Sequence, residues 1–186
     1  MEYYNLDFFG LKRKLPLVSL TPKIKVASLS LLGDTELTDK AAEKLKEKLE
    51  KYHFDYLVGP EVKVVPLLYA LSQKFGQKRY IVCRKSIKGY MNDPFFLKTP
   101  QGVKSNFLVL DGPDAELLPG KKVAVIDDVV SSGTTLTNLE NLLKQAGAEI
   151  EVVATIFKQG DKYEKDLLFL SSLPVFFNQL PLDKKT

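Results

Sequence analysis

The sequence predicts an α/β fold in which a central parallel sheet is flanked by helices. A small hood is expected beside it, built from the N-terminal segment, to which the C-terminal segment can contribute. Two observations lead to this prediction. Apolar runs of strand length alternate with helical patterns through the middle of the chain, which is typical of a parallel sheet covered on both faces. With 186 residues, of which 45% are hydrophobic, the chain is also long enough for one packed domain.

The N-terminal part of the chain is expected to form the hood. Residues 1–35 hold Pro16 and Pro22 among short apolar runs, which suits short strands or an extended cap. A helix is expected next, over residues 37–52, because apolar residues recur there with helical spacing and Thr38 can cap its start. The inner stripe of this helix consists of Ala42, Leu45, Leu49 and Tyr52.

Strands and helices then alternate along the chain. Short apolar runs predict strands at residues 55–59, 79–84, 107–112, 123–127 and 149–157. Helical spacing predicts helices at residues 64–76 and 136–146, each closed by a glycine. Residues 86–104 show no periodicity and indicate a long loop or a loose hairpin, and loops of this length inside one domain are usually functional. Residues 173–186 are too irregular to assign.

Composition and charge argue against several classes of protein. The net charge is +4 and the lysines are scattered, which argues against a nucleic-acid-binding surface. No window approaches the roughly 20 apolar residues that cross a bilayer, and residues 1–10 lack the pattern of a signal peptide. The single cysteine, Cys83, lies in an apolar run and cannot form an intramolecular disulfide. We therefore expect a cytoplasmic protein without a membrane segment.

The stretch Val123–Leu136, VAVIDDVVSSGTTL, joins an apolar strand, two acids and a hydroxyl-rich glycine loop. Ligands of a parallel sheet bind beyond the carboxyl ends of its strands, which is where Asp127 and Asp128 stand. A helix begins shortly after them, and its first N–H groups would bind a phosphate that Gly133 allows to come close. The candidates for this phosphate site are Ser131, Ser132, Gly133, Thr134 and Thr135.

The two acids would repel a phosphate, so we expect them to face the sugar hydroxyls of the same ligand, directly or through a bound magnesium ion. A ligand with a phosphate at one end and a diol at the other is a ribose 5-phosphate. The pattern resembles the motif of the type I phosphoribosyltransferases that binds 5-phosphoribosyl 1-pyrophosphate (PRPP). Acids at the end of a parallel strand also precede Ser-rich helix caps in receiver domains and NTPases, but no GxxxxGK[ST] loop supports an ATPase here.

Residues 58–66, VGPEVKVVP, are similar to the pyrophosphate loop of the same family. The resemblance assigns pyrophosphate contacts to Gly59, Pro60, Glu61, Val62 and Lys63. Lys63 would supply a cation for the charge of the departing group. An ordinary turn from strand to helix with an exposed lysine is the alternative for this segment.

Residues 83–91, CRKSIKGYM, resemble the RKxxK segment that opens a mobile catalytic loop in this family, here residues 86–104. The resemblance implies that Arg84 and Lys85 bind pyrophosphate and that Lys85 and Lys88, together with Asp128, act in catalysis. A solvated basic turn is the alternative. The chain departs from the adenine enzymes on the next strand, where Phe107 and Asp111 stand in place of a Tyr-Glu pair.

The base would lie near the end of the strand at residues 149–157. Phe157 could stack on a purine and Lys158 could donate to an exocyclic oxygen, as a lysine does in 6-oxopurine enzymes. Packing in the core is the alternative for Phe157. Aromatic residues of the N-terminal segment could cap the base or form a dimer contact; they are Tyr3, Tyr4, Phe8 and Phe9.

The resemblance as a whole implies a single phosphoribosyltransferase domain, most like the adenine phosphoribosyltransferase-like proteins. Its substrates would be PRPP and a purine base, with Mg²⁺ held indirectly by Asp127 and Asp128, and the protein would be a cytoplasmic homodimer. Two alternatives remain open at this stage. One is an enzyme for xanthine or hypoxanthine, and the other is a non-catalytic protein that senses PRPP.

Overall fold

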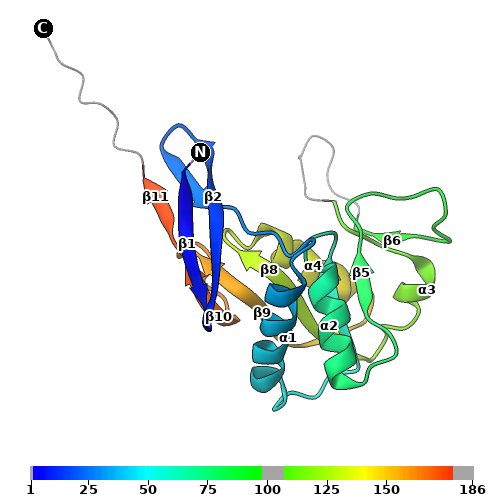
Figure 1. The fold of residues 1–186 in the computed structure, drawn as a ribbon. Helices are drawn as coiled ribbons and strands as arrows, with labels where there is room; N and C mark the ends of the chain where they lie inside the picture. The colour runs from blue at the N-terminus through cyan, green and yellow to red at the C-terminus, as the bar shows by residue number, and fades with distance from the viewer. Residues whose placement is uncertain (1, 98–106, 178–186) are drawn as a thin grey trace, which may run out of the picture.

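The computed structural model describes residues 2–97 and 107–177. Its centre is a five-stranded sheet in the order β10-β9-β8-β4-β5 (Figure 1). The strands are β4 (Tyr56–Pro60), β5 (Ile81–Cys83), β8 (Lys122–Val130), β9 (Glu149–Gln159) and β10 (Leu168–Leu173). All four pairs of neighbouring strands are parallel, which confirms the predicted fold class.

Helices cover both faces of this sheet. Helices α1 (Thr35–Leu49) and α2 (Val65–Phe75) pack on one face and α4 (Thr134–Gln145) on the other (Figure 1). Alternate residues of β8 serve the two faces, because Ala124 belongs to the apolar cluster under α1 and α2 while Val125 belongs to the cluster under α4. Among the described residues, no helix is both long and apolar enough to cross a membrane.

The hood is a separate antiparallel sheet in the order β1-β2-β3-β11. Its strands are β1 (Tyr3–Phe8), β2 (Leu11–Thr21), β3 (Ile24–Ala27) and β11 (Val175–Phe177), so both ends of the described chain contribute. An ion pair joins the hood to the core, since Arg13 Nε lies 2.7 Å from Asp34 Oδ2 at the start of α1. The Arg13 guanidinium also lowers the pKa of the Asp34 carboxyl.

The start of α1 differs from the prediction. Asp34, not Thr38, caps this helix, and its carboxylate accepts a hydrogen bond of 3.0 Å from the Leu37 N–H. Thr38 lies inside the first turn and donates its hydroxyl to the Asp34 carbonyl at 2.7 Å. Both residues are good caps by type, and the ion pair with Arg13 of the hood favours the earlier one.

The predicted loose hairpin after β5 is present in part. Strand β6 (Phe95–Phe96) pairs antiparallel with β7 (Val109–Leu110). Residues 98–104 of the predicted mobile loop lie outside the described residues. The strand expected at residues 107–112 shortens to two residues, because Asp111 caps the short helix α3 (Gly112–Ala115) through the Gly112 N–H.

Candidate active site

Asp127 and Asp128 lie near the carboxyl end of β8 and are both almost fully buried, at 8% exposure each. The hydrogen bonds that they accept from the backbone are local. Asp127 Oδ1 accepts from the Asp128 N–H at 2.8 Å, and Asp128 Oδ1 accepts from the Val129 N–H at 2.9 Å. Within residues 2–97 and 107–177, no ion pair reaches either carboxylate. Two buried acids therefore stand side by side without a cation bound to them.

The pKa of Asp127 is raised well above its ordinary value. Burial is the main cause and the negative charge of Asp128 is the second. The Asp128 N–H and the positive charge of Lys85 act in the opposite direction and lower this pKa. The arrangement would accept hydroxyl donors or a further cation, because either would favour the charged carboxylate.

The predicted phosphate loop and Asp127 line one small pocket of about 150 Å³. Ser131, Ser132, Gly133, Thr134 and Thr135 all contribute to it, as do Val129, Val130 and Leu136. Gly133 is the N-cap of α4 with a φ of +73°, and its lack of a side chain leaves the first turn uncapped from this position. The Thr134 N–H makes a long contact of 3.5 Å with Ser132 Oγ, which a bound anion could replace. The Ser132 and Thr134 hydroxyl oxygens lie 3.1 Å apart. This pocket has the groups that bind a phosphate.

Tyr163 forms one wall of this loop and was not found from the sequence. A Cβ atom on Gly133 would lie 1.9 Å from Cδ2 of the Tyr163 ring. The Tyr163 hydroxyl donates to Glu140 Oε1 of α4 at 3.1 Å, and Lys165 donates to Glu140 Oε2 at 2.8 Å. No sequence signal marks this contact, because the connection between β9 and β10 lies far along the chain from the loop.

The segment predicted to bind pyrophosphate lies at the end of β4, which pairs with β8. Gly59 is required there by close packing, since a Cβ atom on it would meet the Ile126 carbonyl oxygen at 2.6 Å. The Glu61 N–H already donates to the Cys83 carbonyl at 2.8 Å, and Pro60 has no N–H. Backbone donation to a ligand from this segment therefore falls to Val62 and Lys63.

Lys63 connects the pyrophosphate loop to the hood. Its ammonium group donates to the Leu29 carbonyl at 2.8 Å, just after β3. An ammonium has three N–H donors, so Lys63 can hold this contact and still bind an anion.

Glu61 has a different role from the predicted one. Its carboxylate accepts the Lys85 N–H at 2.7 Å and lies 2.5 Å from Arg84 Nε. The Glu61 N–H, which is predicted to bind pyrophosphate, already donates to the Cys83 carbonyl, and the carboxylate of Glu61 holds Arg84 and the backbone of Lys85. The Arg84 guanidinium also lies 6.0 Å from the centre of the Tyr90 ring.

The rest of the predicted catalytic loop is only partly connected to the pocket. Lys88 forms a turn in which the Met91 N–H donates to its carbonyl at 3.0 Å, and in the described part of the loop no contact joins Lys88 to Asp127. Asp111 anchors this segment by accepting the Asn92 N–H at 3.0 Å. Phe107 packs on Phe96, with ring centres 5.4 Å apart.

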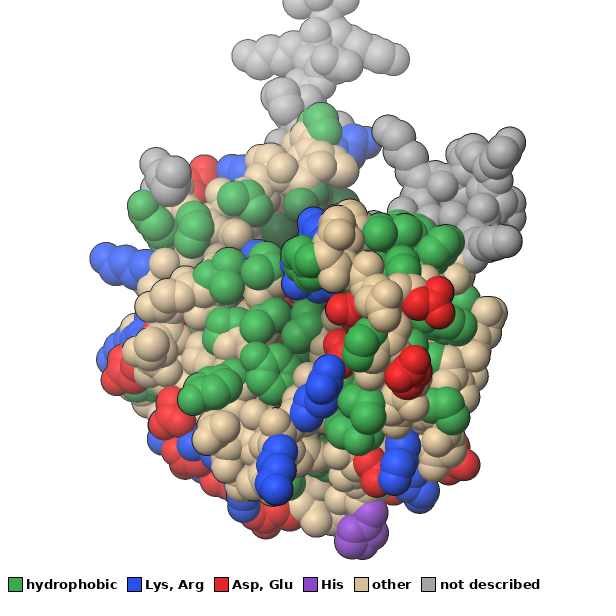
Figure 2. Space-filling model, turned by 90° about the vertical axis from the view of Figure 1, so that its right-hand side faces the viewer, with side chains coloured by type: hydrophobic (Ala, Val, Ile, Leu, Met, Phe, Trp, Pro, Cys, Tyr) green, Lys and Arg blue, Asp and Glu red, His purple; other side chains and the backbone are tan. Residues whose placement is uncertain are grey.

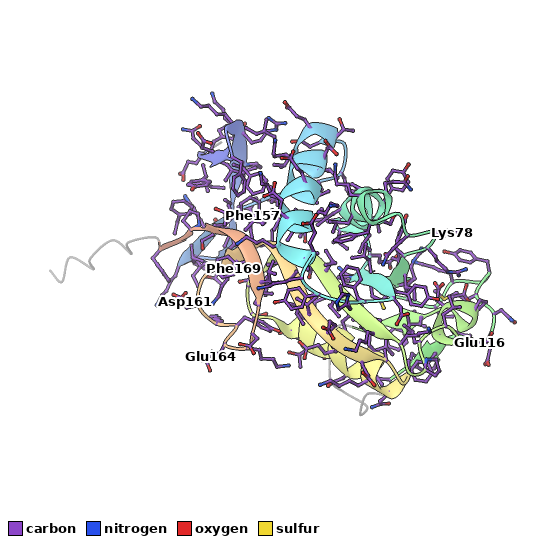
Figure 3. All side chains as sticks on the ribbon, turned by 90° about the horizontal axis from the view of Figure 1, so that it is seen from below. Lys78, Glu116, Phe157, Asp161, Glu164 and Phe169 are labelled. Carbon is purple, nitrogen blue, oxygen red and sulfur yellow. The ribbon has the colours of Figure 1, made fainter. Side chains whose placement is uncertain are left out.

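Phe157 lies in the core and not in a base pocket. Its side chain is fully buried, and its ring centre is 5.1 Å from that of Phe8 in the hood (Figure 3). A ring without an exposed face cannot stack on a base, so this predicted contact is wrong for this structure. Lys158, which follows it, is half-buried and pairs with Val130, the last residue of β8 before the phosphate loop. Its neighbour Gln159, which sequence reasoning missed, donates to the Ala27 carbonyl at 3.4 Å.

A larger groove lies away from these residues. It has a volume of about 970 Å³ and runs between the end of α1 and strands β9 and β10. Charged residues of both signs line it, including Lys48, Glu151 and Asp166. None of the predicted site residues is among its lining residues.

Comparison with known proteins points in one direction. The family model of the phosphoribosyl transferase domain matches residues 32–185. An adenine phosphoribosyltransferase of Thermosipho africanus is 31% identical over 145 residues, which are 74% of this chain and 79% of that protein. A hypoxanthine/guanine phosphoribosyltransferase of Methanotorris igneus is 29% identical over 129 residues, which are 68% of this chain and 66% of that protein.

Solved structures agree with this match at the level of the fold. The crystal structure of adenine phosphoribosyltransferase from Thermoanaerobacter pseudethanolicus has a TM-score of 0.65 to this chain at 20% identity. The match covers 91% of this chain and 95% of that one.

Proposed function

The chain belongs to the family of phosphoribosyl transferase domains, and from this premise we propose that it transfers the 5-phosphoribosyl group of PRPP to a purine base, with adenine favoured. The products would be a nucleoside 5′-monophosphate and pyrophosphate. The observation that carries the proposal is that Asp127 and the hydroxyl-rich loop of residues 131–135 line one pocket. A phosphate and a sugar diol of the same ligand would meet there.

The pocket assigns a task to each end of PRPP. The 5′-phosphate would bind the N–H groups at the start of α4 and the hydroxyls of Ser132 and Thr134. Asp127 and Asp128 would accept the ribose hydroxyls, which offer donors beyond the single backbone N–H that each carboxylate accepts in this structure. Binding both ends would fix the C1 carbon of the sugar under the attacking nitrogen of the base.

The leaving pyrophosphate gains negative charge as the C1–oxygen bond breaks. Lys85, which already acts on the charge of Asp127, and the N–H groups of Val62 and Lys63 would stabilise it. One well-placed donor of this kind contributes about 3–4 kcal/mol to the transition state. Residues 86–104 would exclude water, which would otherwise hydrolyse PRPP.

Magnesium fits this site as a ligand shared with the substrate. Asp127 and Asp128 supply hard carboxylate oxygens, which suit Mg²⁺. In the part of the chain that the structure describes, no three acidic, histidine or cysteine side chains gather into a metal cage, so ribose hydroxyls, water or pyrophosphate would have to complete the coordination. When bound, the ion would neutralise part of the pyrophosphate charge.

A 6-oxopurine is the second candidate base. Lys158 lies near the end of β9, paired with Val130 just before the phosphate loop, and could donate to an exocyclic oxygen, which adenine lacks. The Methanotorris igneus relative is named for hypoxanthine and guanine, whereas the Thermosipho africanus relative is named for adenine.

We also place this activity in a cytoplasmic homodimer that binds neither membranes nor nucleic acids. The fully buried free thiol of Cys83 suits a reducing compartment. Figure 2 shows that basic side chains are scattered on the visible face and mixed with acidic and hydrophobic ones, so this face has no continuous basic surface. Tyr3 and Phe9, each 51% exposed on the hood, are candidates for the dimer contact.

The test is pyrophosphate release from PRPP and Mg²⁺ with adenine, hypoxanthine, guanine, xanthine and orotate in turn. Release with adenine supports the proposal, and release with a 6-oxopurine alone supports the second candidate. PRPP binding by calorimetry without release from any base would favour a sensor. Absence of both binding and release would overturn the assignment of the pocket.

A further inference from the structure

The phosphate loop rests on a segment from a distant part of the chain. Tyr163, at 3% exposure, lies in the connection between β9 and β10, and its ring occupies the space next to the Cα of Gly133. Asp161 and Glu164 of the same connection are exposed and lie at the outer edge of the molecule (Figure 3). The connection thus turns its aromatic residue inward against the loop.

A buried acid holds this tyrosine in place. Glu140 of α4 is 7% exposed, and its two oxygens accept the Tyr163 hydroxyl at 3.1 Å and the Lys165 ammonium at 2.8 Å. Burial, followed by the charge of Glu140, raises the pKa of Tyr163 to about 12. The phenol therefore stays protonated and donates this hydrogen bond throughout the neutral pH range.

The contact between the Tyr163 ring and Gly133 lies at the part of the loop that would bind an anion. Gly133 has a left-handed backbone conformation, with a φ of +73°, and is the N-cap from which the first N–H groups of α4 are oriented. Glycine adopts this conformation at little cost but also leaves it easily. A ring packed directly against its Cα restricts that movement.

We propose that Tyr163, held by Glu140, is a positioning residue for PRPP that keeps the phosphate loop in its binding conformation. The inference rests on the proposed function, because it concerns the phosphate end of the same pocket. The Tyr163 hydroxyl bonds to Glu140, so the residue acts through the loop and not on the reacting atoms. Its effect should appear in PRPP binding and leave the affinity for the base unchanged.

The experiment compares Tyr163→Leu with Tyr56→Leu. Tyr56 packs against the same apolar cluster as Tyr163 but lies at the amino end of β4, paired with Val123 near the start of β8, whereas the pocket lies at the carboxyl end of β8. We expect Tyr163→Leu to raise the KM for PRPP roughly tenfold, with the KM for the base within about twofold of wild type. Tyr163→Phe keeps the ring but loses the hydroxyl that Glu140 holds, so it should raise the KM for PRPP by less than Tyr163→Leu does but above the wild-type value. Tyr56→Leu should lower thermal stability without changing either KM.

The inference is overturned if Tyr163→Leu and Tyr56→Leu change the KM for PRPP equally, or if Tyr163→Leu raises both KM values alike. Should Tyr163→Leu fail to fold, Tyr163→Met fills the space with a flexible apolar side chain and is held to the same criteria.

Calorimetric titration of each variant with PRPP and with ribose 5-phosphate separates this inference from the proposed reaction. If wild type binds PRPP but turns over no base, the reaction fails, while weaker binding by Tyr163→Leu than by Tyr56→Leu still supports the positioning role. If wild type binds neither compound, both are wrong.

Discussion

A single buried acid, Glu140, and a buried pair, Asp127 and Asp128, flank the phosphate loop, and these two sites differ in the groups that surround the carboxylates. Glu140, at 7% exposure, is bound by a phenol and an ammonium group from the same segment of the chain. Asp127 and Asp128, at 8% each, are hydrogen-bonded to neighbouring backbone N–H groups. A buried charge that the chain itself neutralises serves the fold, whereas a buried pair without a cation is suited to a ligand.

The lack of a cation paired with Asp127 among the described residues affects the stability of the folded protein. Because burial and Asp128 raise the pKa of Asp127, the folded state holds a proton on this group more tightly than the unfolded state does. The stabilisation from that proton is fully present at pH values below the pKa of Asp127 in the unfolded state. It is lost as the pH rises through the pKa of Asp127 in the folded state. At neutral pH we therefore expect the ligand-free protein with Asp127 to be less stable than a variant with an uncharged residue at this position.

The largest expected effect comes from Asp127→Asn. The amide keeps an oxygen for the Asp128 N–H but removes the charge that would bind the ribose hydroxyls, so kcat/KM should fall by at least about 10²-fold. The melting temperature of the free protein should rise, by about 2–4 °C for each 1 kcal/mol gained in a chain of this size. Calorimetry and the pyrophosphate assay measure the two effects.

Glu140→Gln is the control that sharpens this contrast. It removes the charge that Lys165 pairs with, so it should lower the melting temperature where Asp127→Asn raises it. If both substitutions destabilise the free protein, the two groups of acids do not differ as we describe.

Sequence alone was sufficient for one side of this comparison and not for the other. The parallel sheet and the loop from Asp127 to Thr135 are local patterns, in which strand, acids and glycine are consecutive in the chain. The contacts of Tyr163 with Gly133 and of Glu61 with Arg84 join segments that only the folded topology brings together. Phe157 was misassigned because an aromatic residue at a strand end has the same local pattern whether it faces a ligand or the hood.

Gly133→Ala should have the next largest effect, on stability as well as PRPP binding. A left-handed alanine costs about 1–2 kcal/mol, and the clash of its Cβ with the Tyr163 ring adds overpacking of about 1–3 kcal/mol. Gly76→Ala is the matched control, since Gly76 has a φ of +67° with no atom within 4 Å of its Cβ position. Equal losses in urea denaturation would show that the Tyr163 ring yields to the extra methyl group.

The pH dependence of stability offers a third test. The stability advantage of Asp127→Asn over wild type should shrink as the pH falls from neutrality toward the ordinary aspartate value of 3.8, because wild type then regains its favourable proton. Chemical denaturation of both proteins across this range measures the difference. An advantage that stays constant with pH would mean that the substitution acts through packing and not through charge.

Lys165→Met should have the smallest effect and tests how Glu140 is held. The Lys165 side chain is 52% exposed, and ion pairs with one exposed partner contribute less than about 1 kcal/mol. Glu140 would keep its hydrogen bond from Tyr163, so the KM for PRPP should stay close to that of wild type. A large rise in that KM would mean that the ammonium of Lys165, and not the phenol, secures the loop. The carboxylate of Glu140 would then depend on a cation from the chain, just as we propose that Asp127 and Asp128 depend on a ligand.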